Sequence, residues 1–397
     1  MTFEEARACV IERVMAGRVF PNPEEVALEC AAGRILAQQI RADRDYPAVA
    51  RSVRDGFAVR AEDVPGRLRV TGEVRAGERF DGAVSAGEAV EIMTGAPVPR
   101  GADAVIMVEH VIRAADETVS TDRPAERGQF INPQGCEATA GDILLGPGKR
   151  LDFSDVALLA ANGNARVAVC PKPRVALLAT GDEIVPVTET PLEFQVRNSN
   201  VYSLAAQVTN AGGVPVILPV AKDDFDDTLG LMERGLAADL LLLSGGVSAG
   251  KYDLVERVLA ELGAVFYFDR VLIQPGQPLV FGRVRDKFFF GLPGNPVSTM
   301  VTFEVFARAA LELLAGQSHT GLPFVLAPLT RDFRHKPGLT RFLPASISWT
   351  NGTPALTPVS WSGSGDVPAL TRANAFLVAD AGRPEWKAGE LMRVLLK

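Results

Sequence analysis

The segments RVALLATGDE, residues 174–183, and LLLLSGGVSAGKYD, residues 240–253, each run from a hydrophobic strand into a loop of glycine and small residues. A third loop of this kind, GLPGNPVS at residues 291–298, follows three phenylalanines. Glycine, serine and threonine let backbone N–H groups approach an anion closely, and a helix that starts behind such a loop adds a partial positive charge. The three loops together predict a phosphate-binding site.

The chain after residue 173 alternates between strand and helix patterns. Such alternation predicts a parallel sheet with right-handed crossovers, in which ligands bind at the carboxyl ends of the strands. VFYFDRVLI at residues 265–273 is expected to form one strand, and LVFGRV-RD-KFFF at residues 279–290 a hairpin. The three glycine-containing loops should therefore meet at one edge of this sheet.

The remainder of the chain has a different pattern of predicted secondary structure. Short valine-rich strands between Asp55 and about Val119 predict a β-rich insertion. Residues 1 to about 45 are expected to be helical, with a capping box at Thr2 and a second element starting at Asn22-Pro23. The predicted fold class is α/β multidomain: a central doubly wound, mostly parallel sheet, the insertion, a helical and linker N-terminal domain, and a C-terminal β domain. The expected ranges are 1–46 with 138–170, 47–137, 171–320 and 321–397.

Composition restricts the classes of partner. The 397 residues are 47% hydrophobic and 22% charged, with a net charge of −7 and no block of like charge, so neither nucleic acid nor an anionic membrane is an expected partner. Four dispersed cysteines without a C-x-x-C spacing argue against a structural zinc site and a disulfide framework. No run approaches the length of a membrane span. A cytoplasmic location is expected.

Each motif alone also has a simpler interpretation. The glycines of SGGVSAGKYD could only allow a tight turn, the carboxylates of TGDE could only cap the next segment, and PGNP could be a rigid turn. GVSAG also matches the G-x-S-x-G nucleophile elbow of hydrolases, with Ser248 as the nucleophile. An HGGG-type oxyanion segment is absent from the sequence, which disfavours that interpretation. The conjunction of motifs is more specific than any one of them.

Six motifs in this order resemble the MoeA-type molybdopterin molybdenumtransferases, the family of the gephyrin E domain, over nearly the whole chain. They are SVRDGFAV, IMTGAPVPRGADAVIMVE, TGDE, SGGVSAGKYD, QPGQPLVFG and GLPGNPVS. The resemblance implies the last step of molybdenum cofactor synthesis, in which molybdate is inserted into adenylylated molybdopterin and AMP is released with Mg²⁺. It also implies a homodimer with a shared cleft and transient contact with other cofactor-biosynthesis proteins. An adenylyltransferase acting on molybdopterin and a non-catalytic scaffold are the alternatives.

The resemblance carries residue roles with it. It implies catalytic roles for Asp55, Thr94, Glu183 and Asp253, of which Glu183 and Asp253 would hold Mg²⁺. The residues expected to bind the phosphate-bearing substrate are Ser244, Gly245, Gly246, Ser248, Gly250, Lys251, Pro293, Gly294, Asn295 and Pro296.

The chain departs from the family pattern at several charged positions. Asn132 stands in place of an arginine and Glu137 in place of an aspartate. Gln274 and Gln277 replace two lysines, and Pro344 falls where an arginine is expected. These changes remove positive charge that would attract an oxyanion. Our hypothesis from the sequence is that Arg54 and Lys251, which lie inside motifs, compensate for the loss.

Overall fold

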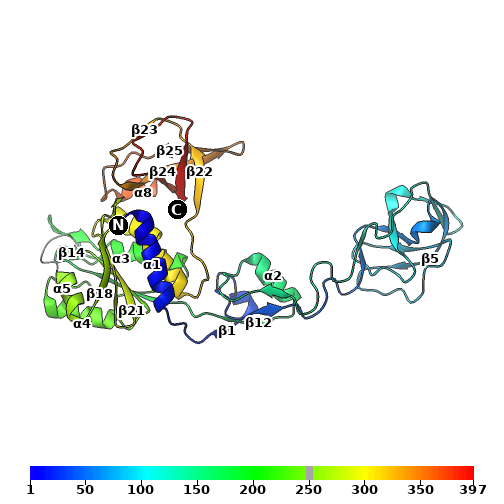
Figure 1. Cartoon of the computed structure of the whole chain (residues 1–397), viewed down its shortest axis with the longest axis horizontal. Coiled ribbons are helices and arrows are strands. Elements are labelled where there is room, and N and C mark those ends of the chain that lie inside the picture. The colour runs from blue at the N-terminus through cyan, green and yellow to red at the C-terminus, as the bar shows by residue number, and fades with distance from the viewer. Residues whose placement is uncertain (247–253) are drawn as a thin grey trace. The chain divides into compact units, whose positions relative to one another are not determined.

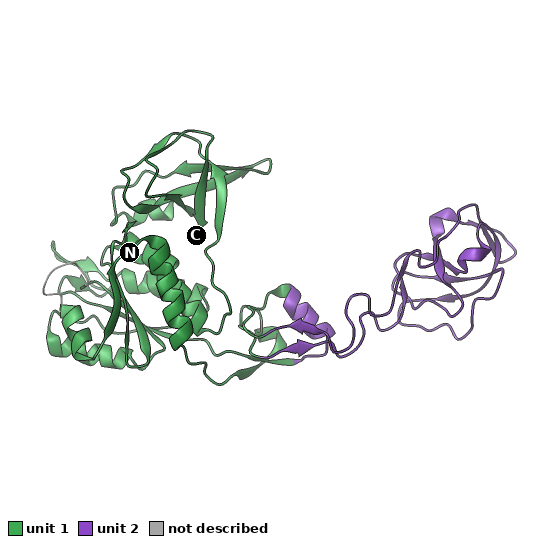
Figure 2. Ribbon diagram, in the orientation of Figure 1, with its two compact units in different colours: residues 1–37, 147–153, 166–397 green, residues 38–146, 154–165 purple. Residues whose placement is uncertain are grey.

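The computed structural model describes residues 1–246 and 254–397 and divides into two compact units (Figures 1 and 2). Unit 1 comprises residues 1–37, 147–153 and 166–397, and unit 2 comprises residues 38–146 and 154–165. Unit 1 contains a central α/β sheet and a C-terminal β sheet, and unit 2 contains the β-rich insertion. Among the described residues, no helix is both long and apolar enough to cross a membrane.

The central sheet has six strands in the order β16-β13-β17-β21-β20-β18. The first four are parallel to one another, and β20 is antiparallel to both of its neighbours. The predicted mostly parallel sheet is therefore confirmed, as is the hairpin formed by β20 and β21. The strands are β13 (Arg174–Ala179), β16 (Val214–Ile217), β17 (Leu240–Ser244), β18 (Val265–Arg270), β20 (Pro278–Val284) and β21 (Lys287–Leu292).

Both faces of this sheet are buried, which explains its continuous hydrophobic strands. Successive leucines of β17 enter two different core clusters, because side chains alternate across a strand. One cluster is completed by α1, α3 and the helical run α6–η4–α7, and the other by α4 and α5. The helices are α1 (Phe3–Gly17), α3 (Asn200–Asn210), α4 (Phe225–Gly235), α5 (Leu254–Glu261), α6 (Pro296–Thr302), η4 (Phe303–Ala307, a π-helix) and α7 (Arg308–Leu314).

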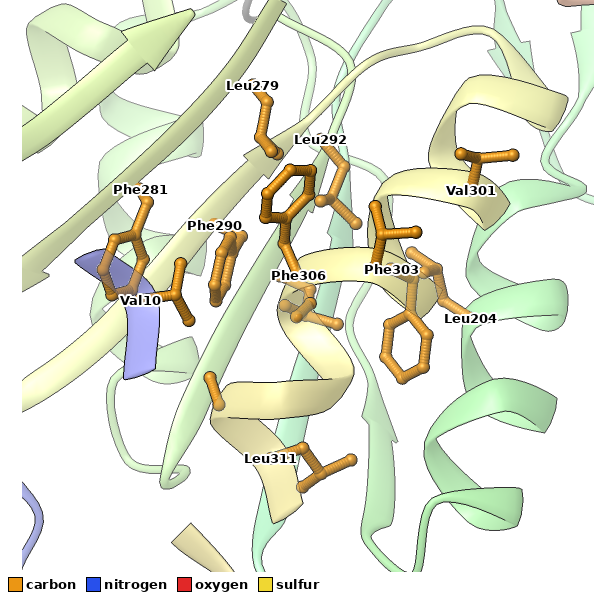
Figure 3. Close-up of a cluster of buried hydrophobic side chains, with 14 of the residues drawn as sticks. Val10, Leu204, Leu279, Phe281, Phe290, Leu292, Val301, Phe303, Phe306 and Leu311 are labelled. Atoms are coloured by element: carbon orange, nitrogen blue, oxygen red, sulfur yellow. The ribbon is translucent and has the colours of Figure 1, made fainter. Parts of the chain in front are cut away.

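Helix α1 begins with the predicted capping box, in which Thr2 accepts from the Glu5 backbone and Glu5 accepts from the Thr2 backbone. Its buried face, which includes Phe3 and Val10, packs into the same cluster as Phe281, Phe290 and Phe306 (Figure 3). The four domain ranges stay a prediction, but this helix packs with the α/β core.

Two sequence-based predictions of local structure are wrong. The segment after Asn22-Pro23 is not helical: Glu24–Ala27 forms β1, which pairs antiparallel with β12 (Arg166–Val169), and only a 3₁₀ turn follows. Strand pairing with a distant segment overrides the local preference. VFYFDRVLI is not one strand either, since β18 ends at Arg270 and β19 (Ile273–Gln274) joins the C-terminal sheet. The Val271 N–H donates to the Gln277 carbonyl at this break.

The other two large sheets are mainly antiparallel. The insertion sheet has the order β7-β4-β6-β5-β9-β8, and the C-terminal sheet has the order β19-β24-β26-β28-β22 with β25 paired to β24. Their strands are β4 (Gly56–Val59), β5 (Gly66–Val74), β6 (Glu88–Ile92), β7 (Ala104–Met107), β8 (Ile112–Arg113), β9 (Thr118–Thr121), β22 (Phe324–Pro328), β24 (Thr340–Thr350), β25 (Thr353–Pro358), β26 (Ala375–Ala379) and β28 (Leu391–Leu396).

Candidate active site

The three glycine-containing loops meet at the carboxyl ends of neighbouring parallel strands. β17 lies between β13 and β21, and Ser244 is in register with Ala179 on one side and Leu292 on the other. The Thr180 N–H donates to the Ser244 carbonyl at 3.2 Å, and the Gly245 N–H donates to the Leu292 carbonyl at 3.2 Å. These bonds join the ends of β13, β17 and β21, so the three loops start from the same edge of the central sheet.

These loops line a cavity of about 660 Å³, which we call the strand-end pocket. It lies wholly within unit 1. The structure places eight of the predicted site residues on its wall, whereas their roles stay predictions. The predicted residues that line it are Glu183, Ser244, Gly245, Gly246, Pro293, Gly294, Asn295 and Pro296. The remaining lining residues are Ala179, Thr180, Ile184, Val196, Arg197, Asn198, Ser199, Asn200, Pro278 and Gly365.

Glycine is required at the centre of this pocket. Gly245 and Gly246 have φ values of +94° and +65°, which L side chains rarely adopt. A Cβ on Gly245 would also lie 2.9 Å from the Thr180 carbonyl oxygen, so the loops after β17 and β13 approach each other closely there. The wall of the pocket between these loops is therefore main chain, as an oxyanion site built from backbone N–H groups requires.

Four predicted site residues, Ser248, Gly250, Lys251 and Asp253, lie outside the described residues. Their roles remain predictions, and so does the compensation by Lys251.

Asn200 is a pocket residue that sequence reasoning missed. It lies at the start of α3, is 8% exposed, and its Nδ2 donates to the Ser244 Oγ and to the Gly294 carbonyl, both at 2.8 Å. One amide thereby joins the glycine loop after β17 to the PGNP loop after β21. Its Oδ1 is buried without a hydrogen-bond partner among the described residues. A buried acceptor of this kind is costly unless a ligand or a water donates to it.

Charge on the described wall of the strand-end pocket is limited to one group of each sign, Glu183 and Arg197. The Glu183 carboxylate lies over Gly181, where a Cβ would come within 2.5 Å of its Oε2. The neighbouring Asp182 points elsewhere, because its carboxylate accepts from the Asp223 N–H at 3.2 Å. The Arg197 Nε donates to the Glu189 carbonyl at 2.9 Å. Sequence reasoning did not single out Arg197.

A magnesium ion implied by the resemblance fits this arrangement. Mg²⁺ is usually held by one or two carboxylates together with substrate phosphates and water. Glu183 lines the same cavity as the glycine-containing loops and would supply one carboxylate of such a set. Within residues 1–246 and 254–397, no group of three or more His, Cys, Asp and Glu residues gathers that could hold a metal by itself.

Asp55 and Thr94, predicted from separate motifs, are hydrogen-bonded partners. The Thr94 hydroxyl and backbone N–H both donate to the Asp55 Oδ1, at 2.7 and 2.6 Å. These two bonds, first that of the hydroxyl and then that of the N–H, hold the pKa of the Asp55 carboxyl below its ordinary value. Asp55 is thus kept as a carboxylate. Gly56 follows it because a Cβ there would lie 1.9 Å from the Ile106 carbonyl oxygen.

Thr94 lines a second cavity of about 500 Å³ in unit 2, which we call the insertion pocket. Two of the departures from the family pattern, Asn132 and Glu137, also line it. The other lining residues are Arg44, Asp45, Tyr46, Pro47, Ala48, Arg51, Ser52, Val53, Gly95 and Ala161. Sequence reasoning missed Arg44 and Arg51, because neither belongs to the segments in which it looked for compensating charge.

Arg54, the first residue expected to compensate for lost charge, does not line either pocket. Its guanidinium lies over the Phe130 ring at 5.9 Å and donates to the Val53 carbonyl at 3.2 Å. The structure therefore gives no support to the hypothesis that Arg54 replaces the missing cations.

The fold and these pockets define a multidomain protein of the molybdopterin-binding class, and comparison with known proteins agrees. The chain matches the models of the MoeA N-terminal region (domain I and II) at residues 1–163, a probable molybdopterin binding domain at residues 176–313 and the MoeA C-terminal region (domain IV) at residues 326–397. The chain belongs to the MoeA family.

Individual relatives extend over most of the chain. It is 36% identical to a molybdopterin molybdenumtransferase of Bacillus subtilis, over 94% of this chain and 89% of that protein. It is 33% identical to the protein of that name from Staphylococcus aureus, strain MSSA476, over 94% of this chain and 90% of that protein. A crystal structure of a molybdopterin biosynthesis moeA protein from Pyrococcus horikoshii OT3 superposes with a TM-score of 0.82 at 29% identity, covering 100% of both chains.

Proposed function

We propose that the chain is a molybdopterin molybdenumtransferase, which inserts molybdate into adenylylated molybdopterin and releases AMP with the help of Mg²⁺. The observation that carries this proposal is the strand-end pocket, where three backbone loops and the Glu183 carboxylate line one cavity. Curated relatives of this name cover about nine-tenths of the chain, which supports the same activity.

The pocket residues have distinct roles in this proposal. Backbone N–H groups near Gly245 and Gly246 bind the phosphates of the adenylylated pterin, and Asn200 holds the two loops at a fixed separation. Glu183 and Asp253 would hold magnesium, which when bound would supply positive charge to stabilise the phosphoryl group. Asp55 and Thr94 act on the pterin or on the incoming molybdate.

A direct assay tests the activity. Purified full-length protein is supplied with adenylylated molybdopterin, Mg²⁺ and molybdate, and AMP is measured. The proposal expects AMP release that requires both molybdate and Mg²⁺, and its loss in Asp55→Ala and Asp253→Ala proteins that remain folded. ATP-dependent adenylylation of molybdopterin without preformed adenylate would instead identify an adenylyltransferase. Binding of a partner peptide without any AMP release would identify a scaffold.

A homodimer with a site shared between subunits is the second part of the proposal. The resemblance supports it, because the family's cleft is completed across a homodimer, and Asp55 and Thr94 lie far from Glu183 in the sequence. Mixing inactive Asp55→Ala and Glu183→Gln proteins tests it: a shared site would restore about a quarter of the wild-type activity, because half of the dimers are mixed and each contains one intact site. A fully active monomer in analytical ultracentrifugation would contradict it. We also propose a cytoplasmic location and transient contact with other cofactor-biosynthesis proteins.

A further inference from the structure

The insertion pocket contains one guanidinium that other protein groups leave free. Arg51 lines the pocket, and among the described residues it has no side-chain hydrogen bond or ion pair. The other lining arginine, Arg44, lies 3.4 Å from the Asp43 carboxylate. Arg51 is therefore the positive charge of this pocket that remains available to a ligand.

The position of Arg51 relates it to a residue that the chain has lost. β3 (Arg51–Ser52) pairs antiparallel with β10 (Ile131–Asn132), and Arg51 is directly opposite Asn132. Side chains of such a pair lie on the same face with their Cβ atoms about 5 Å apart. Asn132 is the position at which the resemblance implies an arginine. A guanidinium carried by either strand of this ribbon can reach the same space.

The same ribbon is joined to the loop that carries Thr94. The Gly95 N–H donates to the Ser52 carbonyl at 2.8 Å, and the Ser52 N–H donates to the Ala96 carbonyl at 3.0 Å. Ser52 is 2% exposed, and its hydroxyl donates to the Arg54 carbonyl at 2.6 Å, which shapes the turn before Asp55. The short strand that carries Arg51 is thus held by backbone bonds to the loop that carries Thr94, and both residues line the insertion pocket.

We propose that Arg51 takes over the role of the missing arginine at position 132 and binds a tetrahedral oxyanion in the insertion pocket. Guanidinium groups bind oxyanions through two parallel N–H···O bonds, and the Arg51 side chain lines this pocket together with Thr94. This inference rests on the proposed function for the identity of the anion, which is either free molybdate or a phosphate group of the substrate.

The two acidic residues that line the pocket differ in whether they can neutralise the positive charge of Arg51. Asp45 accepts from the Ala140 N–H at 2.9 Å and from the Gln134 Nε2 at 2.7 Å, so it is already engaged. Glu137 is exposed and lines the same cavity. It can approach Arg51 when no anion is bound, and Glu137→Gln is therefore expected to bind the anion as tightly as the wild type or more tightly.

The experiment exchanges the two residues across the ribbon. Molybdate and inorganic phosphate are titrated separately into full-length wild-type, Arg51→Asn and Arg51→Asn/Asn132→Arg proteins in a calorimeter. Arg51→Asn is expected to weaken binding roughly 10- to 100-fold, the range for one charged hydrogen-bonding group. The double variant is expected to regain most of the affinity. Arg69→Asn, at an exposed arginine of β5 outside the pocket, is the matched control and should bind like the wild type.

The outcomes separate this inference from the proposed function. Weakened binding of either anion with recovery in the double variant supports the inference, and the anion affected identifies the ligand group. Unchanged binding of both anions in Arg51→Asn overturns it, and so does a loss that the double variant fails to recover. Arg51→Lys keeps the positive charge but cannot form two parallel N–H···O bonds, so its affinity for the anion is expected to be intermediate. It provides a second test if Arg51→Asn is unfolded. Because titration requires no turnover, absence of AMP release in the wild type would reject the proposed function alone.

Discussion

The strand-end pocket and the insertion pocket solve the problem of binding an anion in different ways. In the first, glycines at the ends of three parallel strands bring main chain to the ligand, and one described group of each charge is present. In the second, short strands and loops position side chains, including Arg51 and Thr94, and the Thr94 hydroxyl donates to the Asp55 carboxylate. A site built from backbone N–H groups depends on the order of the strands, so it can lose charged side chains and still bind an anion. A site built from side chains can keep its charge when a charged residue moves to the neighbouring strand.

The largest effect should come from removing the Glu183 carboxylate, because the strand-end pocket has few charged groups on its described wall. Glu183→Gln is expected to lower molybdate-dependent AMP release roughly 100- to 1000-fold, because it removes the described carboxylate that would hold magnesium. Asp182→Asn is the matched control, since Asp182 accepts from the Asp223 N–H instead. The Mg²⁺ dependence of AMP release is the measurement. Equal activity of the two variants would contradict the assignment of the metal to Glu183.

Steric disruption at Gly56 should act within unit 2. Gly56→Ala places a Cβ 1.9 Å from the Ile106 carbonyl oxygen, and β4 must move away from β7 to accommodate it. A cost of about 1–3 kcal/mol or more in the free energy of unfolding is expected, with loss of the Asp55 and Thr94 hydrogen bonds. Denaturant unfolding and amide NMR shifts of unit 2 measure the change. Gly146→Ala, at a glycine of unit 2 with nothing within 4 Å of the added Cβ and no positive φ, is the control that lacks the clash.

Asn200 tests whether a side chain is needed to hold the main-chain pocket together. Asn200→Ala removes the bonds to the Ser244 Oγ and the Gly294 carbonyl, and about 1–3 kcal/mol of stability is expected to be lost. Asn200→Asp should be worse, because it loses the same donor and also places a buried carboxylate against the Gly294 carbonyl oxygen. Thr209→Ala, at an exposed position of the same helix, should change stability by less than about 0.5 kcal/mol. Wild-type stability and AMP binding in Asn200→Asp would refute this role.

The smallest effect concerns the acidity of Asp55. Thr94→Val removes the hydroxyl that contributes most to the low pKa of the Asp55 carboxyl but retains the backbone N–H, so this pKa should rise toward its ordinary value. Thr94→Ser should leave it low. A carboxyl whose pKa is depressed by folding stabilises the folded chain at neutral pH, and this contribution is lost as the pH falls through the folded-state pKa. Carboxyl NMR titration gives the result, and an unchanged pKa in Thr94→Val would exclude the hydroxyl as its cause.

The sequence predicted the strand-end pocket better than the insertion pocket for physical reasons. Hydrophobic runs ending in glycine loops specify parallel strands, and parallel strands bring their carboxyl ends together, so Glu183, Gly245 and Pro293 could be expected in one place. The place of Asn200 in this pocket could not be predicted, because its role depends on how α3 packs against two loops. The pairing of Arg51 with Asn132 involves two strands of two residues each, which leave no periodic signal in the sequence.

The packing of α1 determines how the α/β region could be separated from the rest of the chain. The Phe3 ring lies edge-on against Phe306 at 5.7 Å and Phe342 at 5.1 Å, and the Arg7 guanidinium donates to the Val305 carbonyl within the π-helix η4. A fragment of residues 171–397 would lack α1, so it would expose the apolar surface that α1 covers and would aggregate. A synthetic peptide of residues 1–17, added in trans, should bind this surface and restore solubility. The amino terminus and the central sheet are in this sense one folding unit, although all of unit 2 lies between them in the sequence.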